Sequence, residues 1–73
     1  MTKLPVVSGQ QCVKAFLRIG FIVIRQRGSH IILRRDDPFS QITIPNHKVI
    51  DLGTLRSILR MADLSIEKFI DLM

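Results

Sequence analysis

The stretch from Ile22 to Arg34 constrains the fold more than any other part of the chain. β-branched residues lie on both sides of Arg27-Gly28, a pattern typical of a β-hairpin with a two-residue turn. The cross-strand pairs expected from this turn are Gln26 with Ser29, Arg25 with His30, and Ile24 with Ile31.

Side chains alternate across a strand, so this register divides the hairpin into two faces. The apolar face, which is expected to cover a core, contains Ile22, Ile24, Ile31 and Leu33. The opposite face contains Val23, Arg25, His30, Ile32 and Arg34. Because it holds a histidine flanked by arginines, this second face is the candidate functional surface.

A helix is expected before the hairpin. Ser8 and Gln11 form a capping-box pattern, and apolar residues recur at helical spacing as far as Ile19, where Gly20 supplies a stop. The helix is therefore predicted over Gly9 to Ile19.

One strand and two helices are expected after the hairpin. The composition of residues 35–39 predicts a turn, and the alternation from Ser40 to Ile44 predicts a third strand. Asp51 is the expected N-cap of a second helix and Ser65 that of a short last helix. The positions expected to be buried on the last helix are Ile66, Phe69, Ile70 and Met73.

The order helix, three-stranded antiparallel meander, helix, short helix predicts an α+β fold of two layers. All helices can pack on one face of the sheet and leave the other open. This arrangement is similar to a double-stranded-RNA-binding fold with an extra C-terminal helix. With 73 residues, the chain is expected to form a single domain over residues 1–73.

Composition narrows the classes of function. The single cysteine, Cys12, excludes an internal disulfide and a zinc site of paired cysteines, and it lies on the apolar stripe of the first helix. No apolar run approaches the roughly 18 residues of a membrane span, and the N-terminus lacks a signal-peptide pattern. We therefore expect a cytoplasmic protein that needs no metal or small-molecule cofactor.

The charge distribution favours a polyanionic partner. The net charge is +5, and the segment from Lys14 to Arg35 contains six basic residues and no acidic one. Such a balance is typical of domains that bind nucleic acid or an acidic protein.

His30 is the first candidate for chemistry. RNA cleavage without a metal needs a base that removes the proton of the ribose 2′-hydroxyl. Imidazole suits this task, because its unperturbed pKa is the closest to neutral pH among the side chains. The nearby arginines would attract the phosphate. From the residues alone, an ordinary solvent-facing strand histidine is the more common explanation of such a position.

Three motifs together resemble the HicA-type toxins, also described as YcfA-like. They are the hairpin string 25–30 (Arg-Gln-Arg-Gly-Ser-His), Pro45-Asn46-His47 after the third strand, and the run 53–60 followed by Leu64-Ser65. The resemblance extends from Ser8 to about Leu72. It departs from the family pattern at Leu52, where a proline is usual, and at Asp63, where a glycine is usual.

The resemblance implies an mRNA interferase of a type II toxin–antitoxin system, with a HicB-like antitoxin that blocks the active site. The family's catalytic histidine corresponds to His30. The residues expected to contact RNA are Arg25, Arg27, Gly28, Ser29 and Lys48. His47 is a second candidate for acid–base chemistry, with ordering of its loop as the alternative.

We therefore expect a metal-independent endoribonuclease that cuts mRNA with His30 as general acid/base. The alternatives are a non-catalytic RNA-binding module that uses the same basic face, and an adaptor that binds an acidic protein. Salt-dependent RNA binding separates the adaptor from the other two, and cleavage separates those two from each other.

Overall fold

The computed structural model describes residues 3–73. The first two residues of the predicted 1–73 domain lie outside the described part. The elements, in chain order, are α1 (Gly9–Leu17), β1 (Ile22–Arg27), β2 (His30–Asp36), β3 (Phe39–Pro45), α2 (Leu52–Met61) and α3 (Ile66–Asp71). The predicted α+β order is confirmed.

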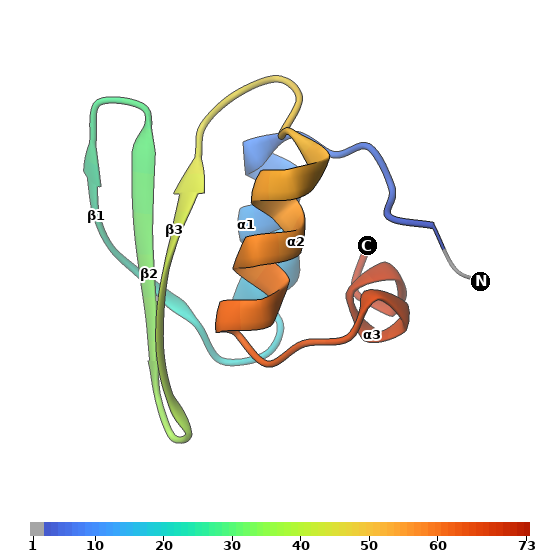
Figure 1. Cartoon of the computed structure of the whole chain (residues 1–73). Coiled ribbons are helices and arrows are strands. Elements are labelled where there is room, and N and C mark those ends of the chain that lie inside the picture. The colour runs from blue at the N-terminus through green and yellow to red at the C-terminus, as the bar shows by residue number, and fades with distance from the viewer. Residues whose placement is uncertain (1–2) are drawn as a thin grey trace.

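The three strands form one antiparallel sheet in the order β1-β2-β3. Helices α1 and α2 lie together on one side of it, and α3, which leads to the C-terminus, lies beyond them (Figure 1). The core forms between these layers. The sheet contributes Ile31, Leu33, Ile42 and Ile44 to it. The helices contribute Cys12, Ala15, Phe16, Leu55, Ile58, Leu59 and Phe69, and the C-cap of α2 contributes Ala62.

The register of the hairpin differs from the predicted one. The turn is formed by Gly28-Ser29, so Arg27 pairs with His30 and Arg25 pairs with Ile32. Gly28 has φ +57° and occupies the first position of this two-residue turn. A glycine with a positive φ is equally suited to the second position, where the predicted turn would place it. The predicted pairing of Arg25 with His30 is therefore wrong.

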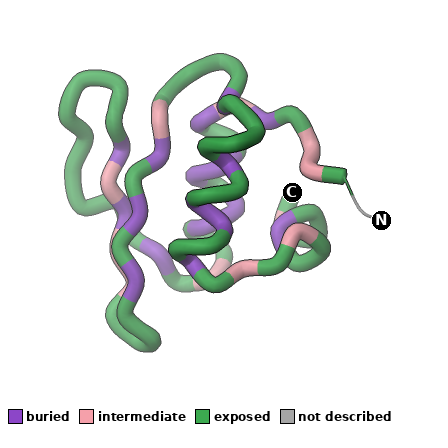
Figure 2. Tube along the Cα trace, viewed as in Figure 1, coloured by how far each residue is buried: buried purple, intermediate pink, exposed green. Residues whose placement is uncertain are grey.

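A β-bulge between Val23 and Arg25 also reassigns two side chains. Beyond it, Ile22 pairs with Arg34 and Val23 with Leu33. An extra residue in one strand reverses the alternation, so Ile22 exchanges faces with Val23. Every residue of β1 is exposed (Figure 2), and Ile22 and Ile24 keep 55% and 40% of their surface. The prediction that they line the core is wrong, because α1 and α2 pack mainly against β3, at the other edge of the sheet from β1.

We call the side of the sheet that points away from the helices the open face. By the observed register it carries Ile22, Arg25, Arg27, His30, Ile32, Arg34, Gln41, Thr43 and Pro45. The ion pair between Arg34 and Asp36, 3.0 Å between Nε and Oδ1, also lies there. The remaining open-face arginines, Arg25 and Arg27, leave this end of the hairpin positively charged.

Both ends of α1 follow the sequence signals, although the helix ends two residues before Ile19. The capping box of Ser8 and Gln11 is formed. At the other end Gly20 has φ +95°, and the N–H of Phe21 donates to the carbonyl of Phe16 at 3.2 Å. This is the hydrogen bond of a Schellman motif, and the two phenyl rings meet edge to face with their centroids 5.2 Å apart.

The turn between β2 and β3 and the last helix each need a correction. Strands β2 and β3 extend through Asp36 and from Phe39, which shortens the predicted turn of residues 35–39 to Asp37-Pro38. On α3, Phe69 is buried and Ile66 is partly buried, but Ile70 is exposed, and so is Met73, which lies beyond the end of the helix. A six-residue helix at the edge of the fold has only one narrow side against the core.

Asp63 ends α2 in the left-handed conformation, with φ +54°. The N–H of Leu64 donates to the carbonyl of Leu59 at 2.9 Å, which completes a second Schellman motif. Glycine adopts this conformation without the Cβ clash of an L-residue. Asp63→Gly is therefore expected to raise the free energy of unfolding by about 1 kcal/mol in urea denaturation. Asp63→Ala removes the same charge but keeps a Cβ, so an equal gain in that variant would contradict this backbone explanation.

No helix among residues 3–73 is both long and apolar enough to cross a membrane.

Candidate active site

A pocket of about 400 Å³ opens where the hairpin, the end of β3 and the start of α2 meet. Its lining residues are His30, Thr43, Pro45, His47, Asp51 and Thr54. A volume of this size can hold a small ligand or one nucleotide unit of a chain. The fold thus brings both histidines of the sequence to one pocket.

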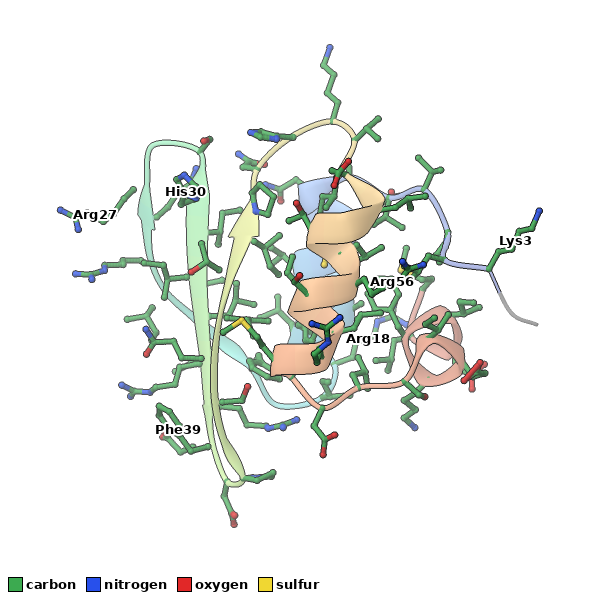
Figure 3. All side chains as sticks on the ribbon, viewed as in Figure 1. Lys3, Arg18, Arg27, His30, Phe39 and Arg56 are labelled. Atoms are coloured by element: carbon green, nitrogen blue, oxygen red, sulfur yellow. The ribbon has the colours of Figure 1, made fainter. Side chains whose placement is uncertain are left out.

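The turn and the sheet position His30. It is the first residue of β2, directly after Gly28-Ser29, and it pairs with Arg27 on one side and Pro45 on the other. The amide of Gln26 donates to the carbonyl of Gly28 at 3.1 Å and closes the turn. His30 is exposed on the open face, so its imidazole is accessible to a substrate (Figure 3).

Backbone contacts from two other segments fix the loop that carries His47. The N–H of Gly9 donates to the carbonyl of His47 at 2.8 Å, and the N–H of Asn46 donates to the carbonyl of Ser29 at 2.6 Å. The side chains of Gln10 and Asn46 add a hydrogen bond of 3.0 Å. The start of α1 and the hairpin turn therefore both hold this loop beside His30.

Gly9 allows the loop to approach this closely. A Cβ at this position would overlap the carbonyl oxygen of Pro45 and would lie 2.9 Å from the Cα of Asn46. These are backbone atoms, which cannot move aside as the end of a flexible side chain can.

The other residues predicted for the site do not line the pocket and lie on the hairpin or next to His47. Arg27 pairs directly with His30, and Arg25 lies two residues further along the open face. Gly28 and Ser29 form the turn, and Lys48 is exposed in the loop next to His47. Figure 3 shows Arg27 beside the hairpin end that carries His30, and Arg18 and Arg56 at the helices.

Four pocket residues were not predicted for the site: Thr43, Pro45, Asp51 and Thr54. Thr43 was expected to face outward, and its strand pairing with Ile32 places it on the same face as His30. Asp51 was predicted only as an N-cap, a role it fills by accepting from the N–H groups of Gly53 and Thr54 at 3.1 and 3.3 Å. Thr54 belongs to the Gly-Thr-Leu motif, which was the one sequence signal that pointed to it.

Residues 3–73 contain no group of three or more His, Cys, Asp or Glu side chains arranged to hold a metal ion. The three such residues of the pocket, His30, His47 and Asp51, are therefore not arranged to bind one metal ion together.

Cys12 lies in the core, apart from the pocket, as its sequence position predicted. Burial raises the pKa of its thiol to about 12 from an ordinary value of 9.0. A thiol that keeps its proton in this way is a poor nucleophile. Cys12 is therefore part of the packing.

The shifted thiol pKa predicts a stability change at alkaline pH. Above about pH 9 the unfolded chain releases the Cys12 proton, whereas the folded chain retains it until about pH 12. The unfolded state then binds fewer protons, so the free energy of unfolding falls by up to about 1.4 kcal/mol per pH unit in this window. Cys12→Ala is expected to lack this slope, and urea titrations from pH 8 to 11 that are parallel for both proteins would contradict it.

The fold and the pocket define a class: a small basic α+β protein with two histidines at one end of an open sheet face. The chain belongs to the HicA toxin family. The model of that family, described as the HicA toxin of bacterial toxin–antitoxin systems, matches residues 9–64. The matched range extends from α1 past the end of α2 and includes every residue of the pocket. No curated protein matches the chain.

Proposed function

We propose that this toxin is a metal-independent endoribonuclease, an mRNA interferase, in which His30 is the general acid/base. The observation that carries the proposal is the position of His30, which is exposed in a pocket on the basic end of the open face. Membership of the HicA toxin family supports the proposal, because a toxin needs a toxic activity and the family match includes every residue of this pocket.

The reaction needs only groups that the chain and the RNA supply. A neutral imidazole of His30 accepts the proton of the ribose 2′-hydroxyl, and the 2′-oxygen attacks the adjacent phosphorus. The bond from phosphorus to the 5′-oxygen breaks, and that oxygen takes up a proton. The products carry a 2′,3′-cyclic phosphate and a 5′-hydroxyl, and no water is consumed in this step.

The cations next to the pocket suit the phosphates of the substrate. Arg27 lies across the strand pair from His30, and a guanidinium can donate two hydrogen bonds to one phosphate. Arg25 and Lys48 extend the positive charge to either side, and the exposed turn of Gly28 and Ser29 lets an RNA backbone approach. With four phenylalanines and no Trp or Tyr, the chain is better suited to backbone contacts than to base stacking.

A HicB-like antitoxin is the proposed partner. It would cover the open face, where Ile22 is exposed and Ile32 is half-buried without a helix above it. An apolar surface surrounded by charged residues is typical of a protein interface. Bound there, the partner would also deny RNA access to His30.

The proposal is tested by incubating the purified chain with a long single-stranded RNA in EDTA. Cleavage that co-elutes with the chain on size exclusion, and that stops when the antitoxin is added, is the expected result. Salt-dependent binding without cleavage would instead identify an RNA-binding module. No binding to RNA would leave an adaptor for an acidic protein and would overturn the proposal.

A further inference from the structure

We infer that His47 is the second proton-transfer residue of the site, the general acid that protonates the departing 5′-oxygen. The inference rests on the proposed function. His47 lines the same pocket as His30, although 17 positions separate them and they lie on different segments.

The loop does not need the imidazole of His47 to be ordered. Its hydrogen bonds to the rest of the fold run through the backbone of His47 and Asn46 and the side chain of Asn46. Within residues 3–73, the His47 side chain forms no hydrogen bond or ion pair, and it is exposed. The alternative that His47 orders its loop is therefore poorly supported, and its imidazole is free to meet a substrate.

The other lining residues are less suited to donate this proton. The hydroxyls of Thr43 and Thr54 are much weaker acids than an imidazolium, and Pro45 has no proton to give. The carboxylate of Asp51 accepts two backbone N–H groups at the start of α2, so it already serves as the N-cap of that helix. Imidazole is the side chain most often used for general acid–base chemistry, and His47 carries the second imidazole of the pocket.

The two histidines then complete a balanced step. His30 receives the proton of the 2′-hydroxyl as the bond between the 2′-oxygen and phosphorus forms. His47, initially protonated, gives its proton to the 5′-oxygen as the bond between that oxygen and phosphorus breaks. The enzyme finishes with the protonation states exchanged, and solvent restores them before the next turnover.

The test compares two substrates that differ only in their leaving group. One is a uridylyl-adenosine dinucleotide, whose 5′-alkoxide must be protonated to leave. The other is uridine 3′-(4-nitrophenyl phosphate), whose nitrophenolate leaves without a proton. Loss of a general acid slows the first reaction and spares the second, whereas a displaced loop slows both.

We expect His47→Ala to cleave the dinucleotide roughly 10²–10⁴-fold more slowly than the parent while it cleaves the nitrophenyl ester at nearly the parental rate. Val49→Ala is the matched control, because Val49 is exposed in the same loop and does not line the pocket. It is expected to cleave both substrates at the parental rate.

Equal slowing of both substrates in His47→Ala would show a role in loop structure and would overturn the general-acid assignment. An unchanged rate on the dinucleotide would overturn it as well. Failure of the proposed function gives a different result: the parent would cleave neither substrate, or His30→Ala would cleave both as fast as the parent.

Discussion

Replacement of His30 by alanine is expected to lower the rate of RNA cleavage by roughly 10²–10⁴-fold, the usual contribution of a general acid or base. The 2′-hydroxyl would then have to lose its proton to solvent, while the arginines next to the pocket would still hold the phosphate. RNA affinity should consequently change little. Single-turnover cleavage and equilibrium binding, measured on the same RNA, separate the two effects.

Unfolding of the variant should not contribute to this loss of activity. His30 is exposed, so His30→Ala is expected to unfold at the same urea concentration as the parent. Imidazole added to the buffer should restore part of the activity, because it can enter the pocket that the truncation enlarges. Undiminished cleavage by His30→Ala would exclude this residue as the acid/base, and a large drop in stability would show that the loss has another cause.

Gly9→Ala is the second substitution expected to have a large effect, although Gly9 lies outside the pocket. The new methyl group would overlap the backbone of Pro45 and Asn46, so either α1 or the loop must move. Overpacking of this kind costs about 1–3 kcal/mol of unfolding free energy. Displacement of His47 by about 1 Å is also expected to reduce cleavage roughly a hundredfold.

Gln10→Ala is the matched control for Gly9→Ala. It removes the hydrogen bond between the side chains of Gln10 and Asn46 and leaves the backbone contacts of the loop unchanged. It should cost no more than about 1 kcal/mol and should preserve most of the activity. Parental stability and activity in Gly9→Ala would contradict the close approach of α1 to the loop.

The order of the elements was predictable because each helix and strand carries its own local signals. Ser8, Asp51 and Ser65 all act as the N-caps that their side chains predicted, and Gly20 ends α1. Apolar periodicity identified the core side of α1 and α2 because those faces are long and continuous. On α3 the same pattern overestimated burial, since periodicity does not show how far the core extends.

The hairpin register was not predictable from local signals. Glycine with a positive φ fits either position of a two-residue turn, so Arg27-Gly28 and Gly28-Ser29 were equally consistent with the sequence. The bulge in β1 has no distinct signal either, because Ile22, Val23 and Ile24 are all β-branched. The pairing of Arg27 with His30 is a property of the folded sheet.

The two histidines of the candidate site were predictable because each belongs to a sequence motif. Their meeting in one pocket was not predictable, because it depends on tertiary contacts. The Gly-Ser-His string pointed to His30, and Pro-Asn-His pointed to His47. Their convergence depends on backbone hydrogen bonds between segments far apart in the chain, such as that from Gly9 to His47. The contribution of Gly9 is the clearest example, since in the sequence it is only the first residue of a helix.

The most direct test of the central claim is an analysis of the ends that the parent protein leaves on RNA in EDTA. Attack by the 2′-oxygen, with histidines as the only proton carriers, predicts a 2′,3′-cyclic phosphate on one fragment and a 5′-hydroxyl on the other. Fragments with a 3′-hydroxyl and a 5′-phosphate would contradict the account, because they arise from attack by water rather than by the ribose.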